Sequence, residues 1–407
     1  MTPEIKQRIE RIRCGEQPEG YKKTKVGVIP DVWRCYQIHE CLSIYNHERK
    51  PISEDVRKTI PGPYPYYGPT QAQGYISTYE SEGPAVLIGE DGDHFLKYKD
   101  REMTMYVDGK YTVNNHAHVL RGTELCETKW FYYAYQHKSL FDAITRQGAG
   151  RYKLTKEALI KLPLQCPPIE EQRKIISILN TQDKVIELKE KRLAEKQRQK
   201  KYLMQQLLTG KKRLPGFSGE WSFLKAKEIF QNISDKDHNC DLPVLSSTQD
   251  KGIVPRDEVD IDIKYDTCSL VTYKKVSKGN FVISLRSFQG GIEYSTYTGL
   301  VSPAYTVLSS RKEISDEYYK QFFKSTDYIN RLNVAVYGIR DGKQVSYEDF
   351  GRIRIPYPPI KEQATIAEVL SAADREIELL RQNIEQEKQK KKALMQLLLT
   401  GIVRVKV

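Results

Sequence analysis

Several polar loops in this chain carry side chains that can read the edges of DNA base pairs. Gln and Asn amides and Arg guanidinium groups make paired hydrogen bonds to bases, while Tyr, Ser and Lys suit phosphates. These residue types gather around 63–75, 108–122, 246–252, 286–291 and 338–344. They predict DNA contacts from Tyr67, Gln71, Gln73, Lys110, Tyr111, Asn115, Arg151, Thr248, Gln249, Lys251, Arg286, Gln289, Arg340 and Lys343. Solvated loops favour the same types, so composition leaves a purely structural role open for each.

Motifs for catalysis do not occur in the sequence. Adenine methyltransferases hold a flipped base with an [Asn/Asp]-Pro-Pro-[Tyr/Phe] loop, whereas the proline pairs here lie in CPPI and YPPI. The string nearest to a phosphate-binding loop, GIRDGKQ at 338–344, is one residue too short and ends in Gln. We therefore expect no catalytic residue, and no S-adenosylmethionine or ATP bound by this chain.

Metal-binding patterns are weak. Asp257, Asp262 and Lys264 hint faintly at a nuclease centre, but their spacing is cramped and an acidic loop explains them equally. His116 and His118 have no third ligand within sequence reach, so we expect a structural role for them. The seven cysteines are odd in number and form no C-x-x-C pair. We interpret them as reduced residues and predict neither a disulfide framework nor a metal site.

Length and composition suggest two or three domains of a soluble protein. The chain has 407 residues, of which 39% are hydrophobic and 29% charged. No apolar run is long enough to span a membrane and the N-terminus lacks the apolar core of a signal peptide, so a cytoplasmic location is expected.

The positive charge is concentrated in two segments of the chain. The net charge is +12, and residues 167–213 hold 13 Lys/Arg against 6 Asp/Glu, while residues 358–407 hold 9 against 7. The rest of the chain is nearly neutral, so DNA reading there must come from local loops rather than from a wholly basic face.

Those two segments are copies of each other. A shift of 191 residues aligns 167–210 with 358–401 without a gap, and 20 of the 44 pairs are identical. Both copies open with Pro-Pro-Ile and share an Asp-x-x-Ile-Glu-Leu core. The first ends in LMQQLLTG and the second in LMQLLLTG.

Each copy predicts one long helix with a heptad seam. Pro-Pro suits a helix start and Thr-Gly a helix end, and about 42 residues would span roughly 63 Å. The predicted seam is Ile175, Leu179, Ile186, Leu193, Leu203 and Leu207 in the first copy, and Ile366, Leu370, Ile377, Leu380, Ile384, Leu394 and Leu398 in the second. Lysines at 189, 196 and 200 interrupt the first seam. An antiparallel pairing within the chain is the simplest closure, although two separate surface helices or a coiled coil between two chains stay open.

The segments preceding the two helices share a frame but little else. Each begins near a tryptophan, Trp33 or Trp221, and ends with a candidate N-cap, Thr155 or Ser346. Their interiors read as mixed α/β: strands are expected at 85–89, 270–276, 280–285 and 304–308, and helices at 125–144 and 314–331.

Over nearly its whole length the chain resembles the DNA specificity subunit of type I restriction-modification systems. The resemblance rests on PPIEEQRKIISIL and PPIKEQATIAEVL, on the two helix endings, on YTVNNHAHVL, and on KGNFVISLRS with GLVSPAYTVL. It implies two α/β (α+β) target recognition domains separated by a pair of long antiparallel helices, with an internal pseudo-twofold repeat. The expected boundaries are 1–19 for an N-terminal helical segment, 20–166 and 214–357 for the recognition domains, and 167–213 and 358–407 for the helices.

The same resemblance implies a bipartite, asymmetric target in double-stranded DNA, with the helices setting the spacing of its halves. It also implies that the helices dock two modification (methyltransferase) subunits, and that ATP-dependent restriction subunits can join. S-adenosylmethionine, ATP and Mg²⁺ would then be bound by those partners. Two alternatives remain: a coiled-coil scaffold that reads no DNA sequence, and a nuclease in its own right.

Overall fold

The chain forms two compact units. The computed structural model describes residues 3–147, 151–238, 241–249, 251–259, 267–285, 287, 291–335 and 345–406. Unit 1 contains residues 1–188 and 384–407, and unit 2 contains residues 189–383. Each unit therefore holds one predicted recognition domain and a part of both repeated segments.

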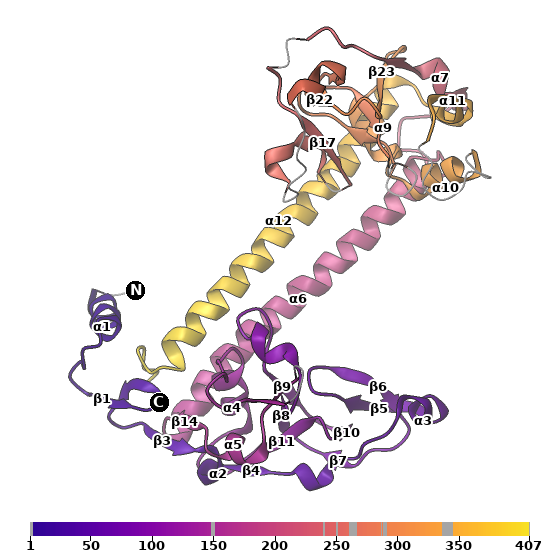
Figure 1. The fold of residues 1–407 in the computed structure, drawn as a ribbon. Coiled ribbons are helices and arrows are strands. Elements are labelled where there is room, and N and C mark those ends of the chain that lie inside the picture. The colour runs from indigo at the N-terminus through magenta and orange to yellow at the C-terminus, as the bar shows by residue number, and fades with distance from the viewer. Residues whose placement is uncertain are drawn as a thin grey trace. The chain divides into compact units, whose positions relative to one another are not determined.

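Both repeated segments are single long helices, α6 (Ile169–Leu207) and α12 (Ile360–Leu398), of 39 residues each (Figure 1). They run antiparallel. In unit 1, Gln182 Nε2 of α6 donates to Glu387 Oε2 of α12 at 2.7 Å, and in unit 2, Lys196 of α6 pairs with Glu376 of α12 at 2.9 Å. Residue numbers therefore increase along α6 in the direction in which they decrease along α12.

All thirteen predicted seam residues are buried or half-buried. Leu370 and Leu179 are 0% exposed, whereas Leu193 and Leu380 are half-buried. At the polar breaks, Lys196 pairs with Glu376 and Lys200 with Asp374, while Lys189 donates to the amide oxygen of Asn383, so the seam continues there through polar contacts.

The Asp of the repeated Asp-x-x-Ile-Glu-Leu core makes equivalent contacts in both units. In unit 1, Asp183 pairs with Lys391 at 2.7 Å and accepts a hydrogen bond from Tyr133 Oη at 2.7 Å. In unit 2, Asp374 pairs with Lys200 and accepts from Gln321 Nε2 at 2.7 Å. This aspartate joins the paired helix to a short helix of the domain, α4 (Thr128–Tyr135) or α9 (Asp316–Phe322).

A buried glutamate fixes unit 1 to the start of α6. Glu171 is 1% exposed and accepts a hydrogen bond from Trp33 Nε1 at 3.0 Å. Its carboxylate also accepts two bonds from the guanidinium of Arg404, at 2.6 and 2.8 Å. Arg404 follows α12, so the last residues of the chain are part of unit 1. We call this three-residue contact the Trp-Glu-Arg clamp.

Unit 2 builds the same clamp on α12. Glu362, 0% exposed, accepts from Trp221 Nε1 at 2.9 Å and from the guanidinium of Arg213 at 2.6 and 2.7 Å. A paired guanidinium supplies the charge and the bidentate hydrogen bonds that a buried carboxylate requires. The clamp glutamate in each long helix and the clamp arginine that follows each long helix recur at the 191-residue spacing of the repeat.

The glutamine after each clamp glutamate is also buried, and it holds the loop that enters the short helix. Gln172 Oε1 accepts from Glu127 N at 2.9 Å and Gln363 Oε1 accepts from Ser315 N at 2.9 Å. The repeated glycine after each long helix has φ near +70° and lies against the clamp tryptophan. A Cβ on Gly210 would meet the Trp221 ring at 3.0 Å, which explains why glycine ends the helix there.

Unit 1 contains two four-stranded sheets. One, in the order β4-β11-β8-β9, is antiparallel throughout, and the other, β6-β5-β10-β7, contains a parallel β5-β10 pair. The strands are β4 (Leu42–Ile44), β5 (Pro61–Tyr67), β6 (Ala72–Ile76), β7 (Ser81–Glu82), β8 (Ala85–Gly89), β9 (Thr104–Val107), β10 (Lys110–Val113) and β11 (Ala117–Gly122). The helix α4 covers the first sheet, and Trp130 and Phe131 of α4 are fully buried in that core.

The remaining elements of unit 1 frame these sheets. They are α1 (Pro3–Arg13), the hairpin β1 (Tyr21–Thr24) and β2 (Gly27–Pro30), β3 (Arg34–Gln37), α2 (Ile38–Cys41), α3 (Glu54–Thr59), the hairpin β12 (Thr145–Gln147) and β13 (Arg151–Lys153), α5 (Lys156–Ile160) and β14 (Pro163–Cys166). Pairing of β14 with β3 brings the end of the domain back to its beginning, directly before α6.

Unit 2 repeats this frame. Its antiparallel sheet has the order β16-β23-β20-β21, and β15 pairs with β24 directly before α12. The elements are β15 (Ser222–Lys225), α7 (Ala226–Ile229), β16 (Phe230–Ile233), β17 (Leu245–Thr248), β18 (Gly252–Pro255), β19 (Lys274–Val276), β20 (Phe281–Ile283), β21 (Glu293–Tyr294), β22 (Gly299–Val301), β23 (Thr306–Ser310), α9, α10 (Thr326–Ala335), α11 (Tyr347–Arg352) and β24 (Arg354–Tyr357).

Several expected elements differ in extent. The helix expected at 125–144 is α4 alone, and the one at 314–331 is two helices, α9 and α10. Only 274–276 of the strand expected at 270–276 is extended, because residues 267–272 form a 3₁₀ helix. Both predicted N-caps are confirmed: Thr155 accepts from Ala158 N, and Ser346 accepts from Asp349 N.

Candidate DNA-reading edges

Four segments of unit 1 that are far apart in sequence meet at one edge of its sheets. The strands β5 and β10 are parallel, so their carboxyl ends lie together, and Asn114 N donates to Tyr67 O at 2.9 Å. Glu90 N, just after β8, donates to His116 O at 2.8 Å, and Leu154 N, just after β13, donates to Glu90 O at 2.7 Å. We call this the reading edge of unit 1.

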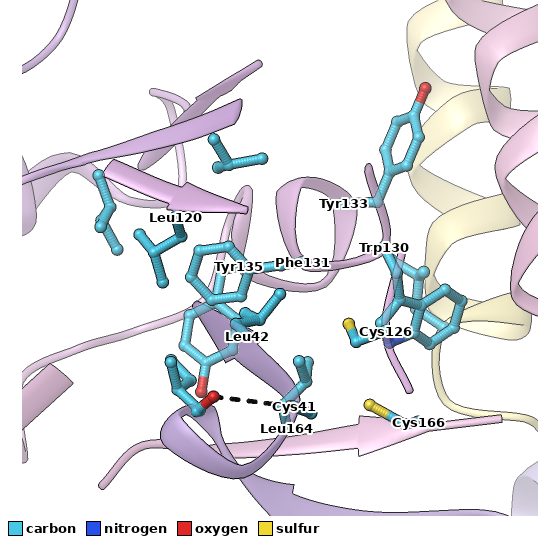
Figure 2. Packing of buried hydrophobic residues seen from close by; sticks show 14 of the residues in the cluster. Cys41, Leu42, Leu120, Cys126, Trp130, Phe131, Tyr133, Tyr135, Leu164 and Cys166 are labelled. Carbon is cyan, nitrogen blue, oxygen red and sulfur yellow. Dashed lines mark hydrogen bonds between the residues drawn. The ribbon is translucent and has the colours of Figure 1, made fainter. Parts of the chain in front are cut away.

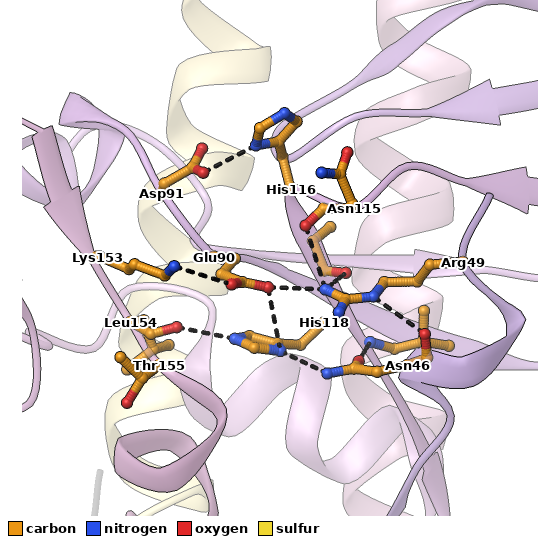
Figure 3. A network of polar contacts seen from close by, with 12 residues as sticks. Asn46, Arg49, Glu90, Asp91, Asn115, His116, His118, Lys153, Leu154 and Thr155 are labelled. Atoms are coloured by element: carbon orange, nitrogen blue, oxygen red, sulfur yellow. Dashed lines mark hydrogen bonds and ion pairs between the residues drawn. The ribbon is translucent and has the colours of Figure 1, made fainter. Parts of the chain in front are cut away.

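A half-buried polar network supports the reading edge (Figure 3). Its centre is Glu90, which pairs with Arg49 at 2.7 Å and with Lys153 at 3.5 Å. The same guanidinium nitrogen of Arg49 donates to the backbone oxygen of Asn115 at 3.2 Å. These bonds hold the turn after β10 against β8 and β13, and leave the Asn115 side chain exposed.

His118 lies inside this network as a neutral imidazole. It is 1% exposed, its Nε2 lies 2.8 Å from Leu154 O, and its Nδ1 lies 2.9 Å from Asn46 Nδ2. A carbonyl only accepts and an amide nitrogen only donates, so Nε2 carries the proton. Burial lowers the pKa of His118 and favours this uncharged form. His116 instead contacts Asp91 at 2.8 Å, so the two histidines have different hydrogen-bond partners.

The structure brings most of the predicted contact residues of unit 1 to the reading edge. Gln71 and Asn115 are exposed in turns at this edge, Gln73 is exposed on β6 and Arg151 is exposed on β13. The Gln73 side chain also accepts a hydrogen bond from Asn114 Nδ2 at 3.2 Å, which links the β5-β6 hairpin to the turn after β10.

Of the other three predicted residues, Tyr67 lies at the reading edge but is half-buried, whereas Lys110 and Tyr111 lie elsewhere. Lys110 starts β10, at the opposite end of that strand from Asn114, and its ammonium lies 4.6 Å from the centre of the Tyr79 ring. Tyr67 is half-buried, and burial raises the pKa of its hydroxyl. Tyr111 is 0% exposed in a small apolar core, so its prediction as a DNA contact was wrong. The three residues Tyr111–Val113 of β10 are all buried, and only Lys110 at its start is exposed.

Two polar residues near this edge were not predicted from the sequence. Arg146 is exposed on β12, which pairs with β13, the strand of Arg151. The carboxylate of Asp91 lies 2.8 Å from His116 Nδ1. Arg146 could have been found by noting that it lies on the same hairpin as Arg151. Asp91 could not, because only the β8-β11 pairing brings it to His116.

In unit 2, the described part of the predicted site is the β17-β18 hairpin. Gln249 and Lys251 are exposed at its turn, while Thr248 Oγ1 accepts from Lys251 N at 3.1 Å and donates to Gly252 O at 3.0 Å, so that hydroxyl serves the turn itself. Lys324 donates to Gln249 O at 3.4 Å and pairs with the buried Glu293, which fixes the hairpin to the domain.

The other predictions for unit 2 concern residues outside the described part of the chain. They are Arg286, Gln289, Arg340 and Lys343, together with Asp262 and Lys264 of the nuclease alternative. Within the described residues, no helix is long and apolar enough to span a membrane.

Two similar α/β units, each clamped to one of two repeated antiparallel helices and carrying unlike loops, define a protein with two recognition modules on a helical connector. Comparison with known proteins identifies the class. The type I restriction modification DNA specificity domain matches twice, over residues 30–197 and 218–389. The chain belongs to the family of DNA specificity subunits of type I restriction-modification systems.

Individual relatives agree with this assignment. The putative MjaX specificity subunit of Methanocaldococcus jannaschii is 26% identical over 95% of this chain and 97% of its own length. A putative type I specificity subunit of Haemophilus influenzae is 34% identical over 143 residues, which are 35% of each chain. The fold is similar to the crystal structure of the S subunit of Mycoplasma genitalium, with a TM-score of 0.58 at 13% identity over 92% of this chain and 97% of that one.

Proposed function

We propose that each unit reads one half of a bipartite, asymmetric target in double-stranded DNA. The observation that supports this is the contrast within the repeat: both units share the Trp-Glu-Arg clamp, whereas their exposed loops differ. A shared frame with different loops suits two readers of two different sequences.

Methylation mapping with the cognate methyltransferase partner tests this proposal. Replacing Asn115 and Gln71 by Ala should relax or abolish recognition of one half-site only. Replacing Gln249 and Lys251 by Ala should do the same to the other half-site. Exposed Lys97 and Lys312 provide matched control positions, because neither lies on the reading edge of unit 1 or on the β17-β18 hairpin of unit 2. If the Asn115 and Gln71 variant weakens both halves equally, the edge is a general phosphate-binding surface instead. If it changes neither, the scaffold alternative gains support.

We propose further that the helix pair sets the spacing of the two half-sites. A pair of rigid helices holds the two readers at a fixed separation, and each added heptad lengthens it by about 10 Å, so helix length fixes the permitted spacer. Lys200 faces Asp374, so one extra heptad after Lys201 with a second one before Asp374 keeps both helices in register. Longer spacers with unchanged half-sites are expected, and altered half-sites would contradict the ruler function.

The helix pair is also the proposed docking surface for two modification subunits. Leu188 in unit 1 and Leu379 in unit 2 occupy the same position of the repeat, and each is 65% exposed. Most other positions exposed on both helices differ between the copies, so the fold alone gives no reason to keep this leucine. A surface that occurs twice suits two copies of one partner.

Subunit stoichiometry tests the docking proposal. Leu188→Asp or Leu379→Asp should each leave one methyltransferase subunit per chain, and the double variant none, as measured by native mass spectrometry. Exposed Lys184→Asp and Arg375→Asp serve as controls for added negative charge. Two bound subunits on the double variant would place the docking surface elsewhere.

Catalysis would then belong entirely to the partners. We propose that this chain is non-catalytic, and that the methyltransferase subunits bind S-adenosylmethionine while restriction subunits, where they join, bind ATP and Mg²⁺. Equilibrium dialysis of the isolated chain should detect none of the three ligands, and binding of any of them would refute the assignment.

A further inference from the structure

Three cysteines meet in the core of unit 1, although they are far apart in sequence (Figure 2). Cys41 ends α2, Cys126 lies two residues before α4, and Cys166 ends β14. Their exposed fractions are 0%, 0% and 3%. The three Sγ atoms all lie within 4.8 Å of one another.

The fold itself does not require cysteine at these positions, because unit 2 builds the same junction without it. Ile229 ends α7 where Cys41 ends α2, and Tyr357 ends β24 where Cys166 ends β14. Ile314 precedes the glutamine-bound Ser315, as Cys126 precedes Glu127. Apolar side chains therefore suffice, yet three of the seven cysteines in 407 residues converge here.

The geometry fits a single thiophilic ion. Zn–S bonds of about 2.3 Å place sulfur ligands roughly 3.8 Å apart, so a shift of less than about 1 Å per sulfur forms the site. Among the described residues, no fourth His, Cys, Asp or Glu belongs to the group, which leaves a purely sulfur donor set from side chains. Thiolate ligands select soft ions such as Zn²⁺ and Cu⁺ over Mg²⁺ or Ca²⁺.

Backbone oxygens beside the cysteines are the candidates for a further ligand. Glu127 O lies 3.6 Å from Cys126 Sγ and Ile38 O lies 3.8 Å from Cys41 Sγ. They accept the thiol protons in the metal-free form. Zn²⁺ would take one of them as its fourth ligand, whereas Cu⁺ is satisfied by three sulfurs.

We propose that Cys41, Cys126 and Cys166 form a structural binding site for one soft metal ion of the Zn²⁺ and Cu⁺ class. Binding deprotonates the coordinating thiols and releases the protons to solvent, so affinity rises with pH. The ion joins α2, the loop before α4 and the strand before α6. The ion thereby connects the part of unit 1 that carries the reading edge to the start of α6. The described residues of unit 2 contain no corresponding site.

Metal titration of the reduced full-length chain tests the site. With Zn²⁺ and, separately, with Cu⁺ under reductant, we expect one equivalent per chain by elemental analysis. Hydrogen exchange should slow in unit 1 and not in unit 2, because a ligand stabilises the part to which it binds. The ion that binds in competition with a chelator identifies the metal.

Matched variants separate ligands from bystanders. Cys41→Ile introduces the residue of unit 2 and should weaken binding by about a hundredfold or more, since losing even an outer-shell partner of a metal costs 10- to 100-fold. Cys14→Ser, at an exposed thiol, should bind normally. The proposal is overturned if the wild-type chain binds less than a tenth of an equivalent of Zn²⁺ and also less than a tenth of an equivalent of Cu⁺. It is also overturned if Cys41→Ile binds the ion as tightly as the wild-type chain does. The wild-type titration needs no variant, so it remains decisive even if Cys41→Ile fails to fold.

Discussion

Removing the guanidinium from the clamp of unit 2 should destabilise that unit. Arg213→Ala leaves the carboxylate of Glu362, 0% exposed, with Trp221 Nε1 as its remaining partner in the clamp. Leaving one charge of a buried pair uncompensated costs about 3–5 kcal/mol, so we expect a loss of that size in the free energy of unfolding of unit 2.

Hydrogen exchange of unit 2 peptides, corrected for intrinsic rates, measures this loss without assuming that the two units unfold together. Lys212→Ala, at the exposed neighbouring residue, is the matched control. Adding Glu362→Gln to Arg213→Ala should recover part of the loss, because no unpaired charge then remains buried in the clamp. A loss below about 1 kcal/mol, or no recovery in the double variant, would show that water reaches the carboxylate and would refute the reasoning.

Four further outcomes are expected. Gly401→Ala should cost unit 1 about 1–3 kcal/mol in chemical denaturation, because φ is +71° and the new Cβ would lie 2.5 Å from Pro30 Cδ. Burial lowers the pKa of His118, so the unfolded state takes up a proton first; unit 1 should be fully stable above about pH 6.5 and lose stability below it, and His118→Asn should remove that slope in urea titrations. Leu370→Ala, at a fully buried seam position, should cost about 2–5 kcal/mol, whereas Leu379→Ala, at a 65% exposed position, should change stability by less than about 0.5 kcal/mol. Deleting residues 400–407 removes the clamp arginine of unit 1 and should speed hydrogen exchange there while unit 2 is unchanged.

The features that could be predicted from the sequence are local or repeated. Periodicity and the Pro-Pro and Thr-Gly signals located both long helices to within a few residues, and hydroxyl side chains located the caps at Thr155 and Ser346. The run AVLIG is the strand β8 with identical bounds. Each of these depends on neighbours within one or two turns of the chain, which sequence patterns record.

The features that escaped prediction depend on contacts between distant residues. The exposure of Lys110 and the burial of Tyr111 follow from which face of β10 meets the core, and loop composition carries no information about that face. The pairing of Arg404 with Glu171 spans 233 residues. A signal for it did exist: extending the repeat past Gly210 and Gly401 aligns Arg213 with Arg404, but the surrounding residues differ and conceal the match.

The pattern of identity within the repeat separates two physical constraints. The clamp glutamates, the glutamines after them and the aspartates facing Lys200 and Lys391 are identical because each has buried or ion-paired partners in its own unit. The outward leucines, Leu188 and Leu379, are identical although both are 65% exposed, and the docking of a partner that we propose would account for their identity. The exposed loops of the two units are held by neither kind of contact, so their sequences can differ while the clamp and the helix pair stay the same. A chain organised in this way can acquire a new DNA target in one unit without disturbing either the helix pair or the surface proposed for its partners.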